Sequence, residues 1–218
     1  MNKIFINILC LLAGLGIGLV GMWLILNNAL HAREPTPYYL NQASPAPKSE
    51  SGASALTQLA IEAVSYIQVE DYASLASLVH PEYGLVFSPY ANINLQSTQC
   101  FSAAQVATLG GNAEVYIWGV FDGSAEPISM TPAAYWKRFV WDRDYTNAPV
   151  LTVNTIAAVG NALENVLEVF AAAQFVEFHF PGSDPKYENL DWSTLRLVFE
   201  EYNGYYLLTA IVHSEWTI

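Results

Sequence analysis

Four polar residues near the C-terminal end of this sequence are the ones best suited to acid/base chemistry or to binding a carboxylate. They are Glu177, His179, Arg196 and His213. Alternate residues of a strand share a face, so Glu177 and His179 are expected to point the same way. His179 could then act as a general base oriented by Glu177, beside the cationic Arg196. The alternative is a cross-strand Glu–Arg pair, with both histidines hydrogen-bonded to their neighbours.

These residues lie in three segments that we predict to be β-strands, at residues 175–180, 194–201 and 205–213. Asn203-Gly204 separates the last two segments, and an Asn-Gly pair between runs of β-branched and aromatic residues is a strong hairpin signal. A sheet is therefore expected to end the domain. If its strands pair in the simplest order, the four polar side chains could line one concave face.

Aromatic residues offer a second candidate binding surface. Trp118 and Tyr135, with Trp136, Trp141 and Trp216, carry large rings with polar edges that could stack on a sugar or an extended ligand. The same residues could instead fill the core of a small curved sheet. Exposure distinguishes the two interpretations, since rings that share one open face favour a ligand.

Metal, cofactor and common catalytic signatures are not evident in the sequence. Residues 142–147 resemble the start of a calcium loop, but Asn147 replaces the glycine at the sixth position and Val153 the glutamate at the twelfth. Cys10 and Cys100 are not expected to pair, and Cys100 has no nucleophile motif around it. No Gly-x-Ser-x-Gly, P-loop, His-Glu-x-x-His or Cys-x-x-Cys sequence occurs. We expect no cofactor and no metal.

Composition and charge limit the class of partner. The chain has 218 residues, is 53% hydrophobic and carries a formal net charge of −12, which fits a packed acidic domain. From Ser54 onward, eighteen carboxylates accompany five basic side chains. Nucleic acid is excluded as a partner because phosphate binding requires a basic surface.

An apolar leader precedes the domain. Residues 4–26, from Ile4 to Leu26, contain no charge and would span about 34 Å as a helix, enough to cross a bilayer core of roughly 30 Å. An uncleaved anchor and a cleaved signal peptide are the two interpretations, and the length favours the anchor. Gly14 and Gly18 fit either a helix-dimer face or the ordinary glycine content of membrane helices.

The leader predicts three parts and a location. Residues 1–32 form the membrane anchor, 33–54 a linker rich in proline and serine, and 55–218 the folded domain. Lys3 favours a cytoplasmic N-terminus, whereas Arg33 opposes it. The domain is therefore expected on the extracytoplasmic side, at a bacterial inner membrane facing the periplasm or at the cell surface.

The remaining domain combines helices and strands. The apolar period predicts a helix over 55–69, and Asp71, Ser102 and Thr131-Pro132 are helix-start signals. Further strands are predicted at 84–90, 113–121 and 150–156, with short helices after each start signal and at 161–170. This order indicates an α+β fold rather than alternating β/α units.

The element order of residues 55–218 resembles the NTF2-like, or cystatin-like, superfamily. That resemblance implies a curved antiparallel sheet wrapped around the N-terminal helices, with a cone-shaped pocket. The segments at 80–90, 118–123 and 195–201 (HPEYGLVFSPY, WGVFDG and LRLVFEE) are also similar to an uncharacterised group of bacterial exported proteins. The expected function is a membrane-tethered binding module for a small ligand or a cell-envelope protein. The alternative is an NTF2-like enzyme with a Glu/His/Arg pocket.

Overall fold

The computed structural model describes residues 50–217. The predicted anchor, with Ile4, Gly14, Gly18 and Leu26, and linker residues 33–49 lie outside this range. Within residues 50–217, no helix combines the length and the hydrophobicity needed to cross a membrane. The first described helix, α2 (Glu50–Gln68), begins five residues before the predicted start at residue 55, so it includes the end of the predicted linker.

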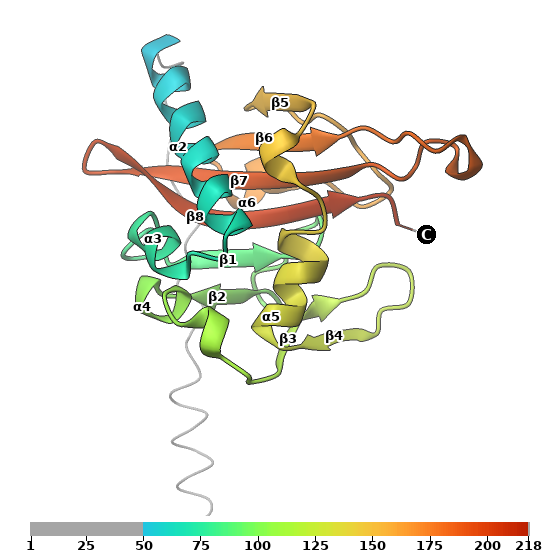
Figure 1. The fold of residues 1–218 in the computed structure, drawn as a ribbon, viewed down its shortest axis with the longest axis horizontal. Helices are drawn as coiled ribbons and strands as arrows, with labels where there is room; N and C mark the ends of the chain where they lie inside the picture. The colour runs from blue at the N-terminus through green and yellow to red at the C-terminus, as the bar shows by residue number, and fades with distance from the viewer. Residues whose placement is uncertain (1–49, 218) are drawn as a thin grey trace, which may run out of the picture. The chain divides into compact units, whose positions relative to one another are not determined.

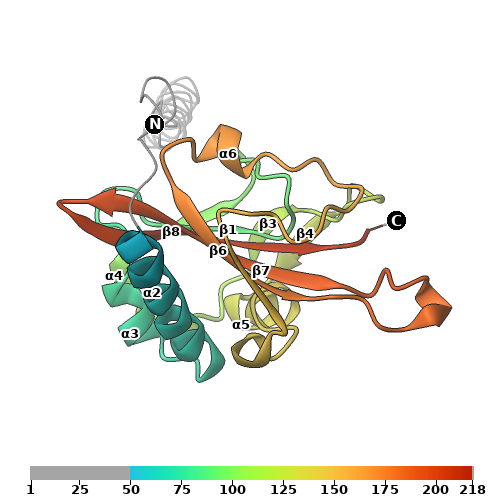
Figure 2. The same ribbon diagram turned by 90° about the horizontal axis from the view of Figure 1, so that it is seen from above.

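The described part is an α+β domain, as the sequence predicts, built on a curved six-stranded sheet (Figures 1 and 2). The strand order is β2-β1-β8-β7-β6-β5. The bounds are β1 (Leu85–Ser88), β2 (Gln99–Phe101), β5 (Val150–Val153), β6 (Gln174–Phe180), β7 (Ser193–Tyr202) and β8 (Tyr205–Glu215). β3 (Tyr116–Val120) and β4 (Pro127–Met130) form a separate two-stranded ribbon.

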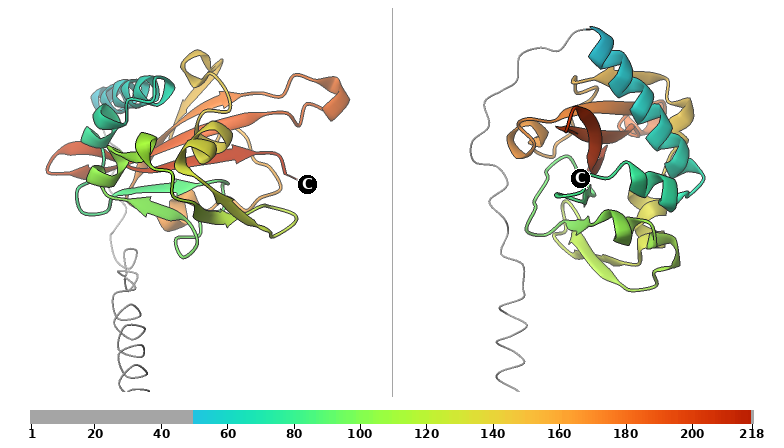
Figure 3. Two further views of the ribbon diagram at one scale, coloured as in Figure 1. Left: turned by 60° about the horizontal axis from the view of Figure 1, so that its bottom comes forward. Right: turned by 90° about the vertical axis from the view of Figure 1, so that its left-hand side faces the viewer.

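The three predicted C-terminal strands are confirmed and occupy the middle of the sheet. Asn203 and Gly204 both have positive φ, 52° and 85°, and form the turn between β7 and β8. Figure 3 (left) shows the β6–β7 connection extending well beyond the rest of the domain. The expectation of a purely antiparallel sheet was wrong at one place, because β1 runs parallel to β8, with Val86 opposite Ala210.

Helix-start signals place most of the short helices. Asp71 caps α3 (Tyr72–Ser77) by accepting a hydrogen bond from the Ser74 N–H, at 3.0 Å. Ser102 and Gln105 form a capping box at the start of α4 (Ala103–Val106), and a 3-10 turn, Leu109–Gly111, follows. Thr131 caps α5 (Pro132–Tyr135), which continues directly into a π-helical turn, Trp136–Val140.

The two faces of the sheet are covered differently. The helix face, against which α2 and α5 pack, holds the main apolar core; its central row consists of Val176, Leu197, Ile211 and Phe87, on four adjacent strands. The opposite face is covered by residues 154–173, which connect β5 to β6 and which we call the strap. Figure 2 shows α6 (Val166–Val169), part of the strap, on the other side of the sheet from α2. The predicted helix over 161–170 is reduced to this single turn.

Paired residues of the central strands form three rows on the strap face. The first row is apolar and contains Phe175, Val198, Ala210 and Val86. The second contains Glu177, Arg196, Val212 and Ser88, and the third contains His179, Thr194 and Ser214. This face therefore changes from apolar through charged to polar along the direction of the strands.

Candidate functional site

Glu177 and Arg196 meet in the second row of the strap face. They are direct cross-strand partners, and the Arg196 Nε donates to the Glu177 Oε1 at 2.7 Å. Both side chains are almost completely buried. The cross-strand pair of the simpler interpretation is therefore present, and its members bind each other.

A second carboxylate, that of Glu164 in the strap, also binds Arg196. The Arg196 Nη1 and Nη2 donate to the two Glu164 carboxylate oxygens at 2.7 and 2.6 Å, a bidentate geometry. The Ala157 N–H of the strap donates to the Glu177 Oε2 at 2.6 Å. The Arg196 guanidinium therefore binds two carboxylates. Ionic and hydrogen bonds from Glu164 and Ala157 join the strap to the sheet.

The pKa values of this ion trio follow from burial and charge. Burial raises the pKa of Glu177 above its usual range, although Arg196 and the Ala157 N–H act in the opposite direction. Burial also disfavours the charged form of Arg196, but hydrogen bonding and charge from Glu164 and Glu177 raise its pKa overall. Arg196 therefore stays cationic.

His179 lies in the third row of the strap face and is directed toward Thr194. Its Nδ1 is 2.7 Å from the Thr194 Oγ1, and its ring lies 6.0 Å from the ring of Trp192. Burial lowers the pKa of His179, so the neutral ring is favoured. Among the hydrogen bonds of the described residues, that of His179 is to Thr194 and not to Glu177.

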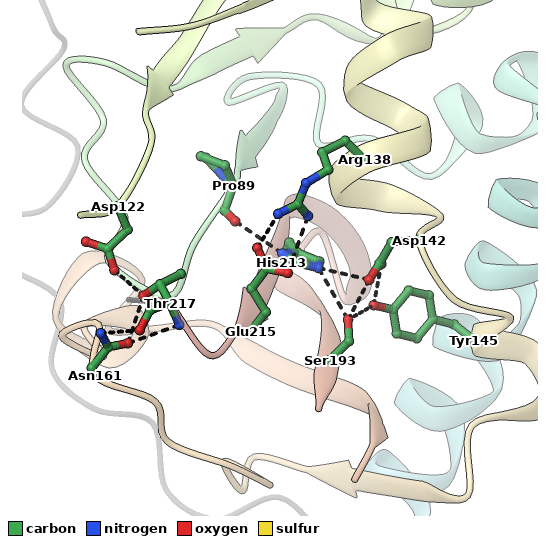
Figure 4. A network of polar contacts seen from close by, with 10 residues as sticks. All are labelled: Pro89, Asp122, Arg138, Asp142, Tyr145, Asn161, Ser193, His213, Glu215 and Thr217. Atoms are coloured by element: carbon green, nitrogen blue, oxygen red, sulfur yellow. Dashed lines mark hydrogen bonds and ion pairs between the residues drawn. The ribbon is translucent and has the colours of Figure 1, made fainter. Parts of the chain in front are cut away.

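His213 lies on the helix face, so the structure does not bring it to the other three residues. Its neighbour in β7 is Leu195, a core residue. Figure 4 shows His213 within a network of polar contacts that also includes Pro89, Asp142 and Ser193. Its Nε2 is 3.3 Å from both the Asp142 Oδ2 and the Ser193 Oγ, and its Nδ1 is 3.2 Å from the Pro89 carbonyl oxygen.

Asp142 is the central acceptor of this network. It receives hydrogen bonds from the Tyr145 hydroxyl at 2.7 Å and from the Ser193 hydroxyl at 2.8 Å. Burial alone would raise the pKa of Asp142, but these donors and His213 lower it to about 2. Burial raises the pKa of Tyr145 well above its usual value. Asp142 is therefore an ionised acceptor with its donors already in place.

The Ser193, His213 and Asp142 arrangement is not that of a nucleophilic triad. In a triad the carboxylate binds one ring nitrogen and the hydroxyl binds the other, so that the ring can move a proton between them. Here both oxygens approach the same nitrogen, Nε2, while Nδ1 faces a backbone carbonyl. The two ring nitrogens of His213 therefore link β8 to residues 89 and 142.

Trp118 and Tyr135, the predicted aromatic candidates, lie inside the core. Their rings stack with centroids 3.9 Å apart, and each residue is 1% exposed. The Trp118 Nε1 donates to the Met130 carbonyl oxygen at 2.9 Å, which satisfies its polar edge. Core packing is therefore the role that their positions support.

Sequence reasoning did not identify Glu164, Asp142 or Ser193 as members of these clusters. Glu164 lies in an irregular segment 32 residues from Arg196, so no periodicity relates the two. Asp142 stands out in the sequence only as part of the calcium-like loop. Within residues 50–217, no group of three or more His, Cys, Asp or Glu side chains is placed to hold a metal ion. The usable signal is an arginine between two leucines, Leu195 and Leu197, in a strand predicted to be buried, which requires carboxylate partners.

A groove at the surface provides a different candidate site. It lies between residues 55–62 of α2 and the β7–β8 hairpin and has a volume of about 520 Å³. Its lining residues are Ala55, Gln58, Leu59, Glu62, Glu201, Gly204, Tyr205 and Tyr206. Tyr205 is 74% exposed. The lining therefore combines aromatic rings and carboxylates, and it contains no basic residue.

Comparisons with known proteins give only a distant likeness. No protein-family model matches this chain, and no curated protein matches it in sequence. Among solved structures, Aln2 from a Streptomyces species is 9% identical, with a TM-score of 0.36 over 79% of this chain and 94% of that one. A putative calcium/calmodulin-dependent protein kinase II association domain from Xanthomonas campestris is 13% identical, with a TM-score of 0.32 over 82% of this chain and 95% of that one. The chain is thus remotely similar to these two structures.

Proposed function

We propose that this protein is a membrane-tethered, extracytoplasmic interaction module of NTF2-like type that binds a partner protein without catalysing a reaction. The apolar leader acts as the anchor and residues 33–49 as the tether. The surface groove between α2 and the β7–β8 hairpin receives the partner. The observation that carries the proposal is the lining of this groove by the exposed Tyr205, the half-buried Tyr206 and two exposed carboxylates, Glu62 and Glu201.

The groove favours a positively charged segment of a cell-envelope protein. Glu62 and Glu201 supply carboxylates, and Tyr205 and Tyr206 supply ring faces, which attract Lys and Arg through charge and cation–π interactions. The five basic residues of the domain all lie elsewhere in the sequence, from Lys137 to Arg196. An acidic partner would therefore be repelled.

The alternative, an enzyme with a Glu/His/Arg pocket, is supported less well. Glu177 and Arg196 neutralise each other in the interior, and His213 lies on the opposite face of the sheet. A general base has to reach the proton that it removes. These side chains are engaged with protein partners, so we propose that none of them acts as a general base.

Binding of a cationic segment is tested with two labelled 12-residue peptides of Gly and Tyr that differ only in carrying Lys or Glu. We expect the Lys peptide to bind, to weaken several-fold from 50 to 200 mM salt, and to weaken at least fivefold for Tyr205→Ser and Glu62→Gln. Tyr187→Ser, an exposed tyrosine outside the groove, is the matched control. Equal binding of both peptides, or equal affinity of all variants, would contradict the proposed groove.

Tethering and orientation are tested separately in cells that produce the full chain. We expect the protein in the membrane fraction at its full mass, resistant to alkaline carbonate. Added protease should digest the domain once the outer side of that membrane is accessible. A shortened protein released in soluble form would indicate a cleaved leader and would leave the groove experiment unaffected.

A further inference from the structure

The strap is an unusual connection, both in its length and in what it leaves exposed. It has 20 residues and contains one helical turn, α6. Irregular connections of this length inside compact domains are uncommon and frequently functional. Three of its aliphatic side chains are more than half exposed, Val159, Leu163 and Leu167. Part of the strap therefore lies at the protein surface rather than in the core.

The strap presents an amphipathic set of groups to the sheet. Its buried side chains are Val166 and Phe170, each 1% exposed, and one of its two carboxylates, that of Glu164, binds Arg196. The sheet opposes these groups with an apolar row that begins at Phe175 and a charged row that contains Arg196. The strap therefore supplies a carboxylate and apolar side chains, and the sheet supplies an arginine and an apolar row that can bind them.

Charge balance makes Glu164 the replaceable partner. Arg196 already has one carboxylate, Glu177, in the adjacent strand, so Glu164 adds a negative charge beyond neutrality. Glu177 is 1% exposed and belongs to the sheet, whereas Glu164 is 15% exposed and belongs to an irregular segment. An incoming carboxylate could replace the carboxylate of Glu164 beside Arg196 and leave the net charge around the guanidinium unchanged.

We propose that the strap face is a second binding site, for an aliphatic monocarboxylate, and that Glu164 occupies it in the unliganded protein. The ligand carboxylate binds the Arg196 guanidinium in the bidentate manner now seen for Glu164. Its hydrocarbon chain lies along the apolar row in place of the strap. The site does not depend on the proposed groove, because the two are lined by different residues.

The affinity follows from the competition with the strap. A ligand that has to displace Glu164 can bind only the molecules in which the strap is open. Its apparent affinity is therefore its intrinsic affinity multiplied by the fraction of molecules in that open state. Wild-type protein should therefore bind decanoate weakly, and a variant without the Glu164 charge should bind it more tightly. Glu164→Gln keeps the size of the side chain and removes that charge.

Calorimetric titration with decanoate tests the site, with decanol and decylamine as matched probes. We expect Glu164→Gln to bind decanoate at least tenfold more tightly than the wild type, and neither to bind decanol or decylamine comparably. The triple variant Glu164→Gln, Glu177→Gln, Arg196→Met removes all three charges at similar volume, an exchange that buried ion groups often tolerate. It should fold, as judged by circular dichroism, and bind no decanoate.

Amide hydrogen exchange of the wild-type protein provides a second measurement if a variant fails to fold. Saturating decanoate should increase exchange in residues 154–173 and leave the β7–β8 hairpin unchanged. The proposal is overturned if decanoate and decanol bind equally, if Glu164→Gln has wild-type affinity, or if exchange in the strap does not respond.

Discussion

The two faces of the six-stranded sheet are formed by alternate residues of the same strands. Different kinds of interaction hold the segments that cover them. The helix face is closed by packing of α2 and α5 against an aliphatic and aromatic core. The strap face is closed by an irregular segment that is held by the Arg196 trio and by the hydrogen bond from the Ala157 N–H to Glu177. Packing contributes most of the folding free energy of a domain, whereas buried ion pairs contribute little net stability. We infer that the helix face sets the global stability and the strap face sets local opening.

The largest loss of stability is expected on the helix face, for Trp118→Ala. Deletion of this buried ring removes its stacking on Tyr135 and leaves a cavity, which should lower the free energy of unfolding by about 3–5 kcal/mol. Urea denaturation measures the change. A loss below about 1 kcal/mol would show that this face is not the dominant source of stability.

The next largest effect is expected on the strap face, for Arg196→Met. This change leaves two carboxylates without their counter-charge, and loss of one partner in a buried ion group costs about 3–5 kcal/mol. We expect a value near the lower end, because Glu164 is partly exposed and can regain water. The triple variant described above should recover most of the loss, and failure to recover would mean that Arg196 acts through packing instead.

The two faces should also respond to acid in different pH ranges. Burial lowers the pKa of His179 on the strap face, so the folded protein binds fewer protons there than the unfolded chain. Its contribution is complete above the unfolded pKa of about 6.5 and is lost as the pH falls through its folded pKa, by at most ~1.4 kcal/mol per pH unit. Asp142 on the helix face, with a pKa of about 2, contributes above about pH 4 and loses its effect as the pH falls toward 2.

Unfolding free energies measured from pH 8 to pH 3 distinguish these ranges. His179→Gln should reduce the loss between pH 7 and pH 5, and Asp142→Asn should reduce the loss below pH 4. Burial also lowers the pKa of His80, so both variants are compared in a His80→Gln background. An unchanged profile for His179→Gln between pH 7 and pH 5 would remove the assignment to the strap face.

The smallest global effect is expected for Asn165→Ala. The Asn165 side chain accepts from the Ile93 N–H at 2.8 Å and donates to the Ile93 carbonyl oxygen at 3.0 Å, which attaches the strap to the loop after β1. Its loss should cost about 1 kcal/mol and should increase amide exchange chiefly in residues 154–173. Asn147→Ala, which removes an exposed bond to Asp144, is the control and should leave the strap unchanged.

Local signals in the sequence predicted much of this fold. The Asn203-Gly204 hairpin and the caps at Asp71, Ser102 and Thr131 depend on neighbours within four residues, and all are present. The strands β2 and β4 were not predicted, because each is only three or four residues long and has no clear alternation. The parallel pairing of β1 with β8 joins segments more than 100 residues apart, which no local pattern encodes.

The candidate site was predicted only in part for the same reason. Alternation in β6 correctly placed Glu177 and His179 on one face, and the cross-strand register brought Arg196 to Glu177. His213 was placed with them, but its position opposite Leu195 puts it on the other face. Which carboxylates complete each cluster depends on how the connecting segments cross the sheet, and their residues carry no periodic pattern.

The central position of β8 has a consequence for biosynthesis. β8 lies between β1 and β7, so these two strands cannot be joined in one sheet until residues 205–215 have been synthesised. A ribosome adds about 5–20 residues each second, so β1 waits on the order of ten seconds for its neighbour. During that interval the edge of β1 that later pairs with β8 is unpaired, and unpaired strand edges are prone to aggregation. We expect a nonsense mutation before Tyr205 to yield no folded product.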